Sequence, residues 1–227
     1  MLTDLQQRVR RIISDLPESG AFALAGGGAL IASGVVQRPT NDLDFFAPHP
    51  NDVTELYEAA RAALEADGLK VTPWRVETTF ARLQIESGAE STAIDLATDY
   101  RLLPARATTE GPVLATPELA ADKVLALGAR AEARDYVDFQ SLAERFSIEE
   151  LCELAGRKDL GFRPHLLLRA LAQFDEIEPA EFDDYTMDYP SLRAFVYAAH
   201  ARLEQQTSVR SPTDRSPESG TDIDHGL

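Results

Sequence analysis

The sequence predicts an α/β protein of the α+β kind, in which a small mixed sheet is followed by a C-terminal helical bundle. Strand-like and helix-like segments alternate as far as residue 112, whereas only helical periodicity follows Thr116. A run of three glycines, Gly26 to Gly28, directly follows a short apolar segment, as in a tight strand-to-helix junction. Together these observations predict a sheet in the first half and helices in the second.

Apolar spacing and turn residues predict the elements of the first half. Thr3 or Asp4 can cap the first helix, Gly68 suits the end of a later helix, and Gly88 divides two alternating segments. The predicted helices are 3–15, 27–33 and 52–66, and the predicted strands are 21–25, 42–46, 70–76, 79–86 and 92–97.

The second half is predicted to be helical, with Thr116 as the N-cap and Pro117 in the first turn of its first helix. Residues 207–227 are rich in Ser, Thr, Pro, Gly and Asp, and we expect them to be disordered. We therefore divide the chain into a core at 1–112, a helical region at 113–206 and a tail at 207–227. The predicted helices of the helical region are 116–130, 134–144, 147–156, 163–173 and 190–205.

Composition limits the class of protein. Of the 227 residues, 44% are hydrophobic and 26% are charged, which is typical of a soluble globular protein, and no apolar run is long enough to span a bilayer. We expect a cytoplasmic protein with no membrane partner. Cys152 is the only cysteine, which excludes an intrachain disulfide and a cysteine-rich zinc site. The formal net charge of −16 disfavours non-specific binding to nucleic acid, so an RNA partner would need a local basic groove.

Asp42 and Asp44 are the strongest candidates for chemistry. Side chains two residues apart on a strand share a face, so both carboxylates point the same way and need a counter-ion. A hard divalent cation, Mg²⁺ or Mn²⁺, fits that need when it carries the phosphates of an NTP. Two solvent-facing aspartates at a strand start are the alternative, but the upstream glycines and the apolar flanks favour a site for nucleotidyl transfer.

The spacing around this pair carries a resemblance to a known family. A hydrophobic residue, a glycine pair, a spacer and an Asp-x-Asp pair resemble the signature of the polymerase-β-like nucleotidyltransferases. Within that superfamily, Gly27 to Leu30 and the segment from Lys123 to Asp138 are similar to AbiEii-type toxins of type IV toxin-antitoxin systems, over roughly residues 20 to 145. The signature residues here are Leu24, Gly26, Gly27, Gly28, Asp42, Leu43, Asp44 and Phe45.

The glycine run and the loop before Asp42 contain candidate nucleotide-binding residues. Gly26, Gly27 and Gly28 would let the backbone approach a phosphate at the start of a helix, where amide groups favour negative charge. Many relatives have Ser or Thr in place of Gly28, so this chain lacks a hydroxyl contact there. Arg38 and Thr40, which match the Arg-x-Thr-x-Asp-x-Asp spelling of bacterial relatives, are expected to bind phosphate or to order the loop.

The remaining candidates come from later segments. Asp95 lies where the superfamily has a third carboxylate, and we expect it to share the metal, with a surface position on an edge strand as the alternative. Lys123 and Arg130 share a face of one helix, so both can reach phosphate. The AbiEii resemblance implies that Lys123 grips the triphosphate and that Asp138 completes the site, as a base or by orienting a cation. Asp135 is a less favoured substitute, and salt bridges between helices are the alternative for the set.

Other residues carry weaker predictions. Residues 174–190 contain seven acids and no base, which is typical of a solvated loop or of a docking surface for a basic partner such as an antitoxin. Trp74 is expected to be a packing residue. Four basic residues are either solvated helix ends or contacts to an RNA acceptor stem, namely Arg157, Lys158, Arg163 and Arg169.

The favoured hypothesis is an Mg²⁺-dependent nucleotidyltransferase that moves a nucleoside monophosphate from an NTP to an acceptor hydroxyl. If the toxin resemblance holds, the acceptor is the 3′ end of a tRNA, and a cognate antitoxin protein is expected as a partner. One alternative keeps the chemistry but uses a small acceptor such as an aminoglycoside, whose positive charge suits an acidic pocket. The other is a non-catalytic interaction module with this fold.

Overall fold

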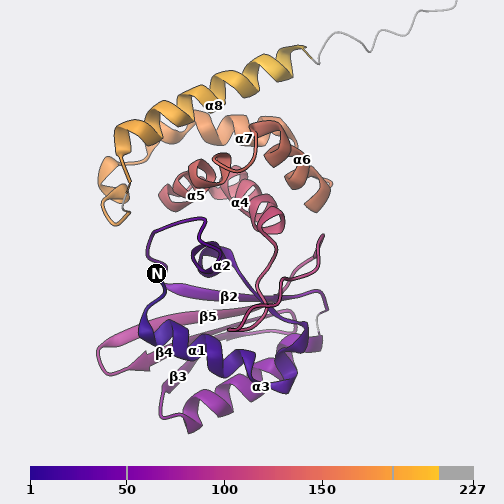
Figure 1. Ribbon diagram of the computed structural model, residues 1–227, viewed down its shortest axis with the longest axis vertical. Helices are drawn as coiled ribbons and strands as arrows, with labels where there is room; N and C mark the ends of the chain where they lie inside the picture. The colour runs from indigo at the N-terminus through magenta and orange to yellow at the C-terminus, as the bar shows by residue number, and fades with distance from the viewer. Residues whose placement is uncertain (50, 186, 210–227) are drawn as a thin grey trace, which may run out of the picture.

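The fold combines one five-stranded sheet with helices on both of its sides (Figure 1). The computed structural model describes residues 1–49, 51–185 and 187–209. The strands are β1 (Ala23–Ala25), β2 (Asp42–Ala47), β3 (Lys70–Val76), β4 (Phe80–Ser87) and β5 (Glu90–Thr98). The α-helices are α1 (Asp4–Ser14), α2 (Gly26–Ala32), α3 (Asn51–Ala66), α4 (Thr116–Arg130), α5 (Ala133–Ala143), α6 (Ile148–Lys158), α7 (Pro164–Ala172) and α8 (Tyr189–Val209). The short 3₁₀ helices are η1 (Pro17–Ala21), η2 (Phe174–Glu176) and η3 (Pro179–Phe182).

The sheet is mixed, which confirms the predicted fold class. Its strand order is β1-β2-β5-β4-β3, and β2 runs parallel to β5 while the other neighbouring pairs are antiparallel. A parallel pair needs a long crossover connection, here formed by α3 and the antiparallel pair β3 and β4. As a result, β2 and β5 lie side by side at the centre of the sheet although they are distant in sequence.

One face of the sheet packs on α1 and α3 (Figure 1). Along β2, the alternate residues Leu43, Phe45 and Ala47 are buried in the core on this side. Because side chains alternate along a strand, Asp42 and Asp44 lie on the other face. That face is the one directed toward the helices of the second half (Figure 1).

The second half of the chain is built around α4, which contacts α5, α6 and α7. Tyr136 on α5 is fully buried, and its hydroxyl donates a 2.6 Å hydrogen bond to the carbonyl of Ala170 on α7. The longest helix, α8, packs on α5 and α7, and α2 contacts α4 where the two halves meet (Figure 1). The helical half thus presents one side of α4 to the sheet.

The segment between β5 and α4 returns to the first strand. Leu24 accepts a hydrogen bond from the amide of Leu114 and donates its own amide to the carbonyl of Pro112, both at 2.9 Å. Glu118, which is fully buried near the start of α4, accepts hydrogen bonds from the amides of Leu102 and Leu103. These bonds fix the start of α4 relative to the sheet.

Several local predictions need correction. The N-cap of α4 is Ala115, and no side chain caps it, so Thr116 lies within the first turn. Trp74, predicted to be a packing residue, is 63% exposed. The acidic segment 174–190 is more than a solvated loop, because it contains η2 and η3 and buries Phe174 and Phe182.

The predicted tail, residues 207–227, lies outside the described residues except for 207–209, which continue α8 beyond its predicted end. The division into regions at 1–112 and 113–206 stays a prediction, although every strand of the described chain precedes residue 99. Across residues 1–49, 51–185 and 187–209, no helix has the length and apolar character that crossing a bilayer requires.

Candidate active site

Three carboxylates from the two central strands lie on the face of the sheet that is directed toward the helices. In the parallel pairing of β2 with β5, Asp44 is directly opposite Asp95, and on its other side Asp44 is opposite Ala25 at the end of β1. Asp42 precedes Asp44 by two residues and therefore shares its face. Neighbouring strands lie about 4.8 Å apart, so the three acids form one group.

Gly26 allows the chain to turn from β1 into α2 directly against this group. Its φ is +56°, a left-handed conformation that residues with a side chain rarely adopt. A Cβ atom at this position would lie 1.8 Å from Oδ2 of Asp44. Glycine is therefore required at this position for two reasons: the left-handed backbone conformation and the lack of room for a side chain.

The next two glycines have different surroundings. A Cβ on Gly27 would lie 3.0 Å from Nη2 of Arg38 and 3.1 Å from Oγ1 of Thr40, so Gly27 borders the site. A Cβ on Gly28 would instead lie 3.1 Å from Cδ2 of Leu43, in the core. Of the two, only Gly27 borders the carboxylate group, whereas Gly28 packs where helix and sheet meet.

The carboxylates repel one another. Burial raises the pKa of Asp44 to about 7; repulsion from Asp42 and Asp95 adds to this shift, and Lys123 opposes it. Burial also raises the pKa of Asp95, with a further contribution from Asp42 against the attraction of Arg82. The negative charge of the three carboxylates is thus not fully balanced near neutral pH, and an added cation would stabilise their ionised forms.

Arg82 on β4 is a site residue that the sequence predictions missed. It is opposite Asp95 in the antiparallel pairing of β4 with β5. Its Nη1 lies 3.2 Å from Oδ2 of Asp95, and its Nη2 lies 4.0 Å from Oδ2 of Asp42. Oδ1 of Asp95 is buried without a hydrogen-bond partner. The available signal was one basic residue between the apolar Ala81 and Leu83 on a predicted strand.

Asp138 on α5 holds two cations beside the carboxylate group. Asp138 is fully buried and accepts hydrogen bonds from Nε and Nη2 of Arg38, at 2.6 and 2.7 Å. It also forms an ion pair with Nζ of Lys123 at 2.9 Å. Burial acts to raise the pKa of Asp138, but Lys123 and Arg38 outweigh it, so the pKa lies below its usual value. Of its two predicted roles, base and orienter of a cation, this geometry fits only the second.

Arg130 and Arg134 add two more cations from the junction of α4 and α5. Arg130 makes a bidentate pair with the fully buried Asp135, at 2.9 and 3.0 Å, and this pairing raises the pKa of Arg130. Asp135 also closes a capping box with Glu132 at the start of α5. Arg134 was not among the predicted site residues; the available signal was its place directly before Asp135, in the segment from Lys123 to Asp138 that resembles the AbiEii toxins.

These groups enclose one pocket of about 140 Å³. Five cations and three carboxylates line it, together with one glycine and one threonine. Eight of the residues singled out from the sequence are among them, joined by Arg82 and Arg134. The lining residues are Gly27, Arg38, Thr40, Asp42, Asp44, Arg82, Asp95, Lys123, Arg130 and Arg134.

Residues 8–198 match the family model described as nucleotidyl transferase AbiEii toxin of type IV toxin-antitoxin systems. That match covers most of the 227 residues. The chain belongs to the AbiEii nucleotidyltransferase family. The resemblance inferred from the Gly-Gly and Asp-x-Asp spacing is thereby confirmed.

Two solved structures have the same fold as this AbiEii family member. JHP933 from Helicobacter pylori is 16% identical, with a TM-score of 0.52, and the match covers 92% of this chain and 97% of that chain. A nucleotidyltransferase from H. pylori, described as putative, is also 16% identical, with a TM-score of 0.53 and coverage of 88% and 95%. No curated protein matches the sequence. At this identity the two likenesses show the fold alone.

The donor atoms of the AbiEii pocket fit a hard divalent cation. In the described part of the chain, no group of three or more Asp, Glu, His or Cys side chains is arranged to hold a metal ion by itself. Mg²⁺, however, is commonly bound by one or two carboxylates and completes its coordination with water and substrate phosphates. Asp42 and Asp44 fit that pattern, and Asp95 has the unpartnered oxygen Oδ1.

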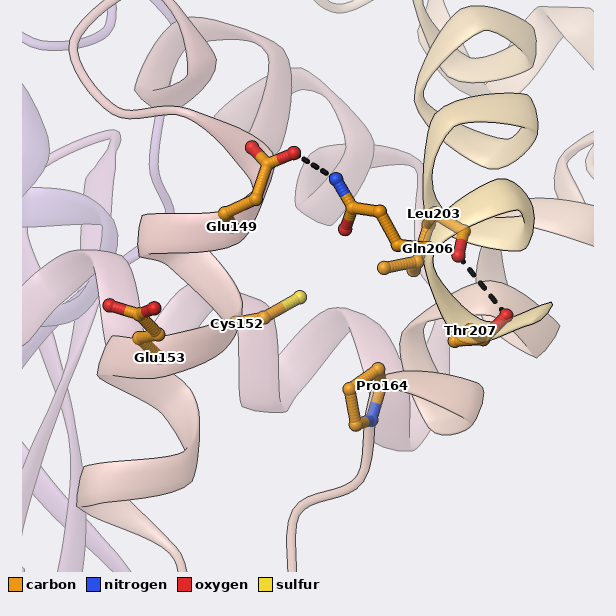
Figure 2. Close-up of a pocket in the computed structure, with 7 residues that line it drawn as sticks. All are labelled: Glu149, Cys152, Glu153, Pro164, Leu203, Gln206 and Thr207. Atoms are coloured by element: carbon orange, nitrogen blue, oxygen red, sulfur yellow. Dashed lines mark hydrogen bonds between the residues drawn. The ribbon is translucent and has the colours of Figure 1, made fainter. Parts of the chain in front are cut away.

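A second, larger pocket of this AbiEii protein lies in the helical half (Figure 2). Its volume is about 350 Å³, and it is lined by residues of α6, by Pro164 at the start of α7 and by residues near the end of α8. Cys152 points into it between Glu149 and Glu153, and burial raises the pKa of this thiol to about 11 (Figure 2). A thiol that stays protonated is a poor nucleophile, so this pocket lacks the chemistry of the first one.

The basic residues proposed as RNA contacts do not act as one group. Lys158 is buried by ion pairs to Asp99 at 2.6 Å, Glu118 at 2.5 Å and Asp122 at 3.0 Å, so it cannot face solvent. Arg163 is exposed, but one of its nitrogens donates to backbone carbonyls of its own loop. The prediction of an RNA contact is therefore wrong for Lys158.

Proposed function

We propose that this protein is an Mg²⁺-dependent nucleotidyltransferase that moves a nucleoside monophosphate from an NTP to the 3′-terminal hydroxyl of a tRNA and releases pyrophosphate. In this proposal it acts as the toxin of a type IV toxin-antitoxin system, and a cognate antitoxin protein is its partner. Membership of the AbiEii nucleotidyltransferase toxin family supports the toxin role and the class of reaction.

One observation supports the reaction above all: the carboxylates of β2 and β5 share a single pocket with cations from α4 and α5. Asp42 and Asp44 would hold Mg²⁺, with Asp95 beside them. Lys123 and Arg130 would bind the triphosphate from the opposite wall of the pocket, where Arg134 also lies. When bound, Mg²⁺ neutralises phosphate charge and stabilises the pyrophosphate as it leaves.

The remaining pocket residues position these groups. Arg38 is locked by its bidentate bond to Asp138 and stays within reach of a phosphate at the pocket wall. Thr40 donates a 3.1 Å hydrogen bond to Oδ1 of Asp42, which orients that carboxylate. Such pre-organisation is the main source of catalysis when the chemistry needs alignment and charge neutralisation.

In the proposed step, the acceptor hydroxyl oxygen forms a bond to the α-phosphorus, and the bond from that phosphorus to the β-phosphate oxygen breaks. The hydroxyl loses its proton. Asp138 is unsuited to accept it, because both of its oxygens are engaged and its pKa is lowered. Asp95 is better suited, because it lines the pocket and its pKa is raised.

The acceptor proposed here is anionic. A small cationic acceptor such as an aminoglycoside was favoured only by the net charge of −16. The pocket does not follow the charge of the whole chain, because five of its lining residues are cations and three are acids. This distribution suits a nucleotide and a nucleic-acid acceptor better than a polyamine-like one.

The test is a labelling assay with purified protein, each of the four NTPs labelled on the α-phosphate, Mg²⁺ and total tRNA. The wild type should label tRNA, and EDTA should abolish the label. Asp44→Asn should lose at least about 100-fold in rate, because it removes a carboxylate from the proposed metal site. Asp15→Asn, at an exposed position at the end of α1, is the matched control and should transfer at the wild-type rate.

Two other outcomes would overturn the proposal in different ways. Label on an added aminoglycoside and none on tRNA would replace the acceptor but keep the reaction. No label with any NTP or acceptor, together with a growth-arrest assay in which Asp44→Asn behaves as wild type, would favour the non-catalytic module.

A further inference from the structure

Trp74 occupies an unusual position beside the pocket. In the pairing of β3 with β4, Pro73 is opposite Leu83 and Arg75 is opposite Arg82, so Trp74 is an extra residue on β3. This β-bulge interrupts the alternation of side chains, as bulges near active sites often do. Trp74 is 63% exposed at this bulge, on an edge strand of the sheet.

Arg82 connects Trp74 to the carboxylate group. Its guanidinium carbon lies 5.6 Å from the centre of the Trp74 ring, in a cation–π contact. The same guanidinium lies 3.2 Å from Oδ2 of Asp95 and 4.0 Å from Oδ2 of Asp42. An exposed aromatic ring is therefore only one side chain away from the site of the proposed reaction.

We propose that Trp74 and Arg82 form the docking platform for the unpaired 3′-terminal base of a nucleic-acid acceptor. This inference rests on the proposed function and assigns the acceptor to a particular surface. An exposed indole gives a stacking face that every base can use, and a neighbouring guanidinium favours the phosphate backbone.

The location also fits the chemistry. The cations of α4 and α5 that would bind the triphosphate lie on the helical side of the pocket, whereas Arg82 and Trp74 lie on β4 and β3. An acceptor on Trp74 would approach the carboxylates over Arg82, from the sheet side. The NTP and the acceptor hydroxyl would thus reach the carboxylates from different directions, as a transfer reaction requires.

The test uses the fact that Trp74 is the only tryptophan of the chain. Its fluorescence is measured while a short single-stranded RNA with a free 3′ hydroxyl is added to the full-length protein. Stacking of a base on the ring should quench the emission saturably. The same RNA with an abasic 3′-terminal nucleotide should quench much less.

The kinetics of Trp74 variants distinguish two roles of this residue, namely stacking on a base of the RNA and positioning of Arg82. Trp74→Ala should raise KM for the RNA acceptor roughly 5- to 150-fold, the range expected for loss of one base–aromatic stack, and leave the affinity for NTP unchanged. Trp74→Phe, which keeps a ring, should recover much of the loss. Tyr100→Ala is the control: Tyr100 is 65% exposed but lines a different pocket, so its loss should have no effect.

Unquenched fluorescence with RNA, or transfer to RNA by Trp74→Ala with a wild-type KM, would overturn the platform while the proposed function stands. A fall in kcat or in NTP affinity at unchanged acceptor KM would also overturn it, because Trp74 would then only support Arg82. If RNA quenches Trp74 but no NTP label is ever transferred, the platform is supported and the proposed function fails.

Discussion

Asp44 lies among groups of its own charge. Burial and the neighbouring Asp42 raise its pKa to about 7, far above the usual range of an aspartate, so the folded protein is destabilised whenever this carboxylate ionises. Functional sites commonly reduce the stability of the folded protein in this way. A charge that binds a metal or substrate is unfavourable as long as the metal or substrate is not bound. The consequence can be measured as a dependence of stability on pH.

Asp44→Asn should be more stable than the wild type at pH 8, and its advantage should be clearly smaller at pH 5.5 and vanish only near the unfolded pKa of the aspartate. Between the unfolded pKa and pH 7, folded Asp44 binds a proton that the unfolded chain has released, so wild-type stability falls as pH rises through this window. The amide does not ionise. The gain at pH 8 should be about 1–3 kcal/mol in the free energy of unfolding, measured by urea denaturation in EDTA.

Adding Mg²⁺ should stabilise the wild type at pH 8 and have little effect on Asp44→Asn. A stability difference that is the same at both pH values would mean that Asp44 does not carry the charge conflict described here.

Gly26→Ala should inactivate the protein although it replaces no charged residue. The new methyl group would lie where Oδ2 of Asp44 now is, and the left-handed backbone costs an alanine roughly 1–2 kcal/mol. Displacement of Asp44 by about 1 Å should reduce the transfer rate about 100-fold. Gly20→Ala is the control, because no atom lies within 4 Å of its Cβ position; equal activity of both variants would contradict the role of Gly26.

At single positions, the sequence predicted residues whose chemistry depends on local spacing. Asp42 and Asp44 share a face because the strand period is two, and this required no knowledge of the fold. Arg82 was missed because its importance comes from pairing with Asp95 thirteen positions away, in a register that only the assembled sheet defines. Lys158 was misjudged for a related reason: its three acidic partners come from other segments.

The junction between α4 and α5 brings the pocket cations together. Ala131, which ends α4, has φ of +53°, and it is the single non-glycine residue with positive φ among the described residues. This left-handed residue lets the chain reverse direction, so that Arg130 on α4 and Arg134 on α5 both line the pocket. Glycine would adopt this conformation with less strain.

Ala131→Gly should stabilise the protein by about 0.5–1 kcal/mol, because relief of left-handed strain exceeds the added entropy of the unfolded chain. The measurement is the urea midpoint of unfolding at constant slope. The matched control, Ala129→Gly within α4, should be destabilising, since a helical residue gains nothing from glycine. If both variants are destabilised alike, the strain assigned to Ala131 is absent.

Elements were predicted better than their ends. The helices and strands were located because apolar periodicity reflects burial against a neighbouring layer. Their ends depend on individual hydrogen bonds. Thr3 caps α1 through a capping box as expected, whereas the N-cap of α4 is Ala115, whose side chain makes no capping hydrogen bond. The bulge at Trp74 could not be predicted from the sequence either, because a bulge is defined by the pairing of two strands and not by one strand.

In the molecule as a whole, Asp138 joins the two halves. It is fully buried on α5 and binds Lys123 on α4 as well as Arg38 from the loop before β2. The side chains of Arg38 and Lys123 are only 4% and 9% exposed, so neither cation can turn to solvent without movement of the halves. The same three residues thus connect stability with the geometry of the pocket.

Asp138→Asn should destabilise the protein by about 3–5 kcal/mol, because it leaves two buried cations without a counter-charge. Nucleotidyl transfer should fall as well, even under conditions where the variant remains folded, since Lys123 and Arg38 lose their positions. Stability is measured by denaturant unfolding and folding by circular dichroism.

The control for that variant is Asp175→Asn, which breaks an exposed pair with Arg193 at 3.4 Å. It should leave the free energy of unfolding nearly unchanged, because exposed ion pairs contribute little. A similar small effect of Asp138→Asn would show that the buried triad does not join the halves.

The amino-acid sequence by itself was sufficient to predict the family, the α+β class, the strand that carries Asp42 and Asp44, and most of the pocket residues. These follow from periodicities and spacings that act within a few residues of the chain. Folding in three dimensions determined the rest: the position of Arg82 beside Asp95, the use of Asp138 as a clamp for two cations, the packing of Gly28 and the exposure of Trp74. Each of these depends on contacts between distant segments, and the free energy of a buried charge is set by those neighbours and not by its place in the sequence.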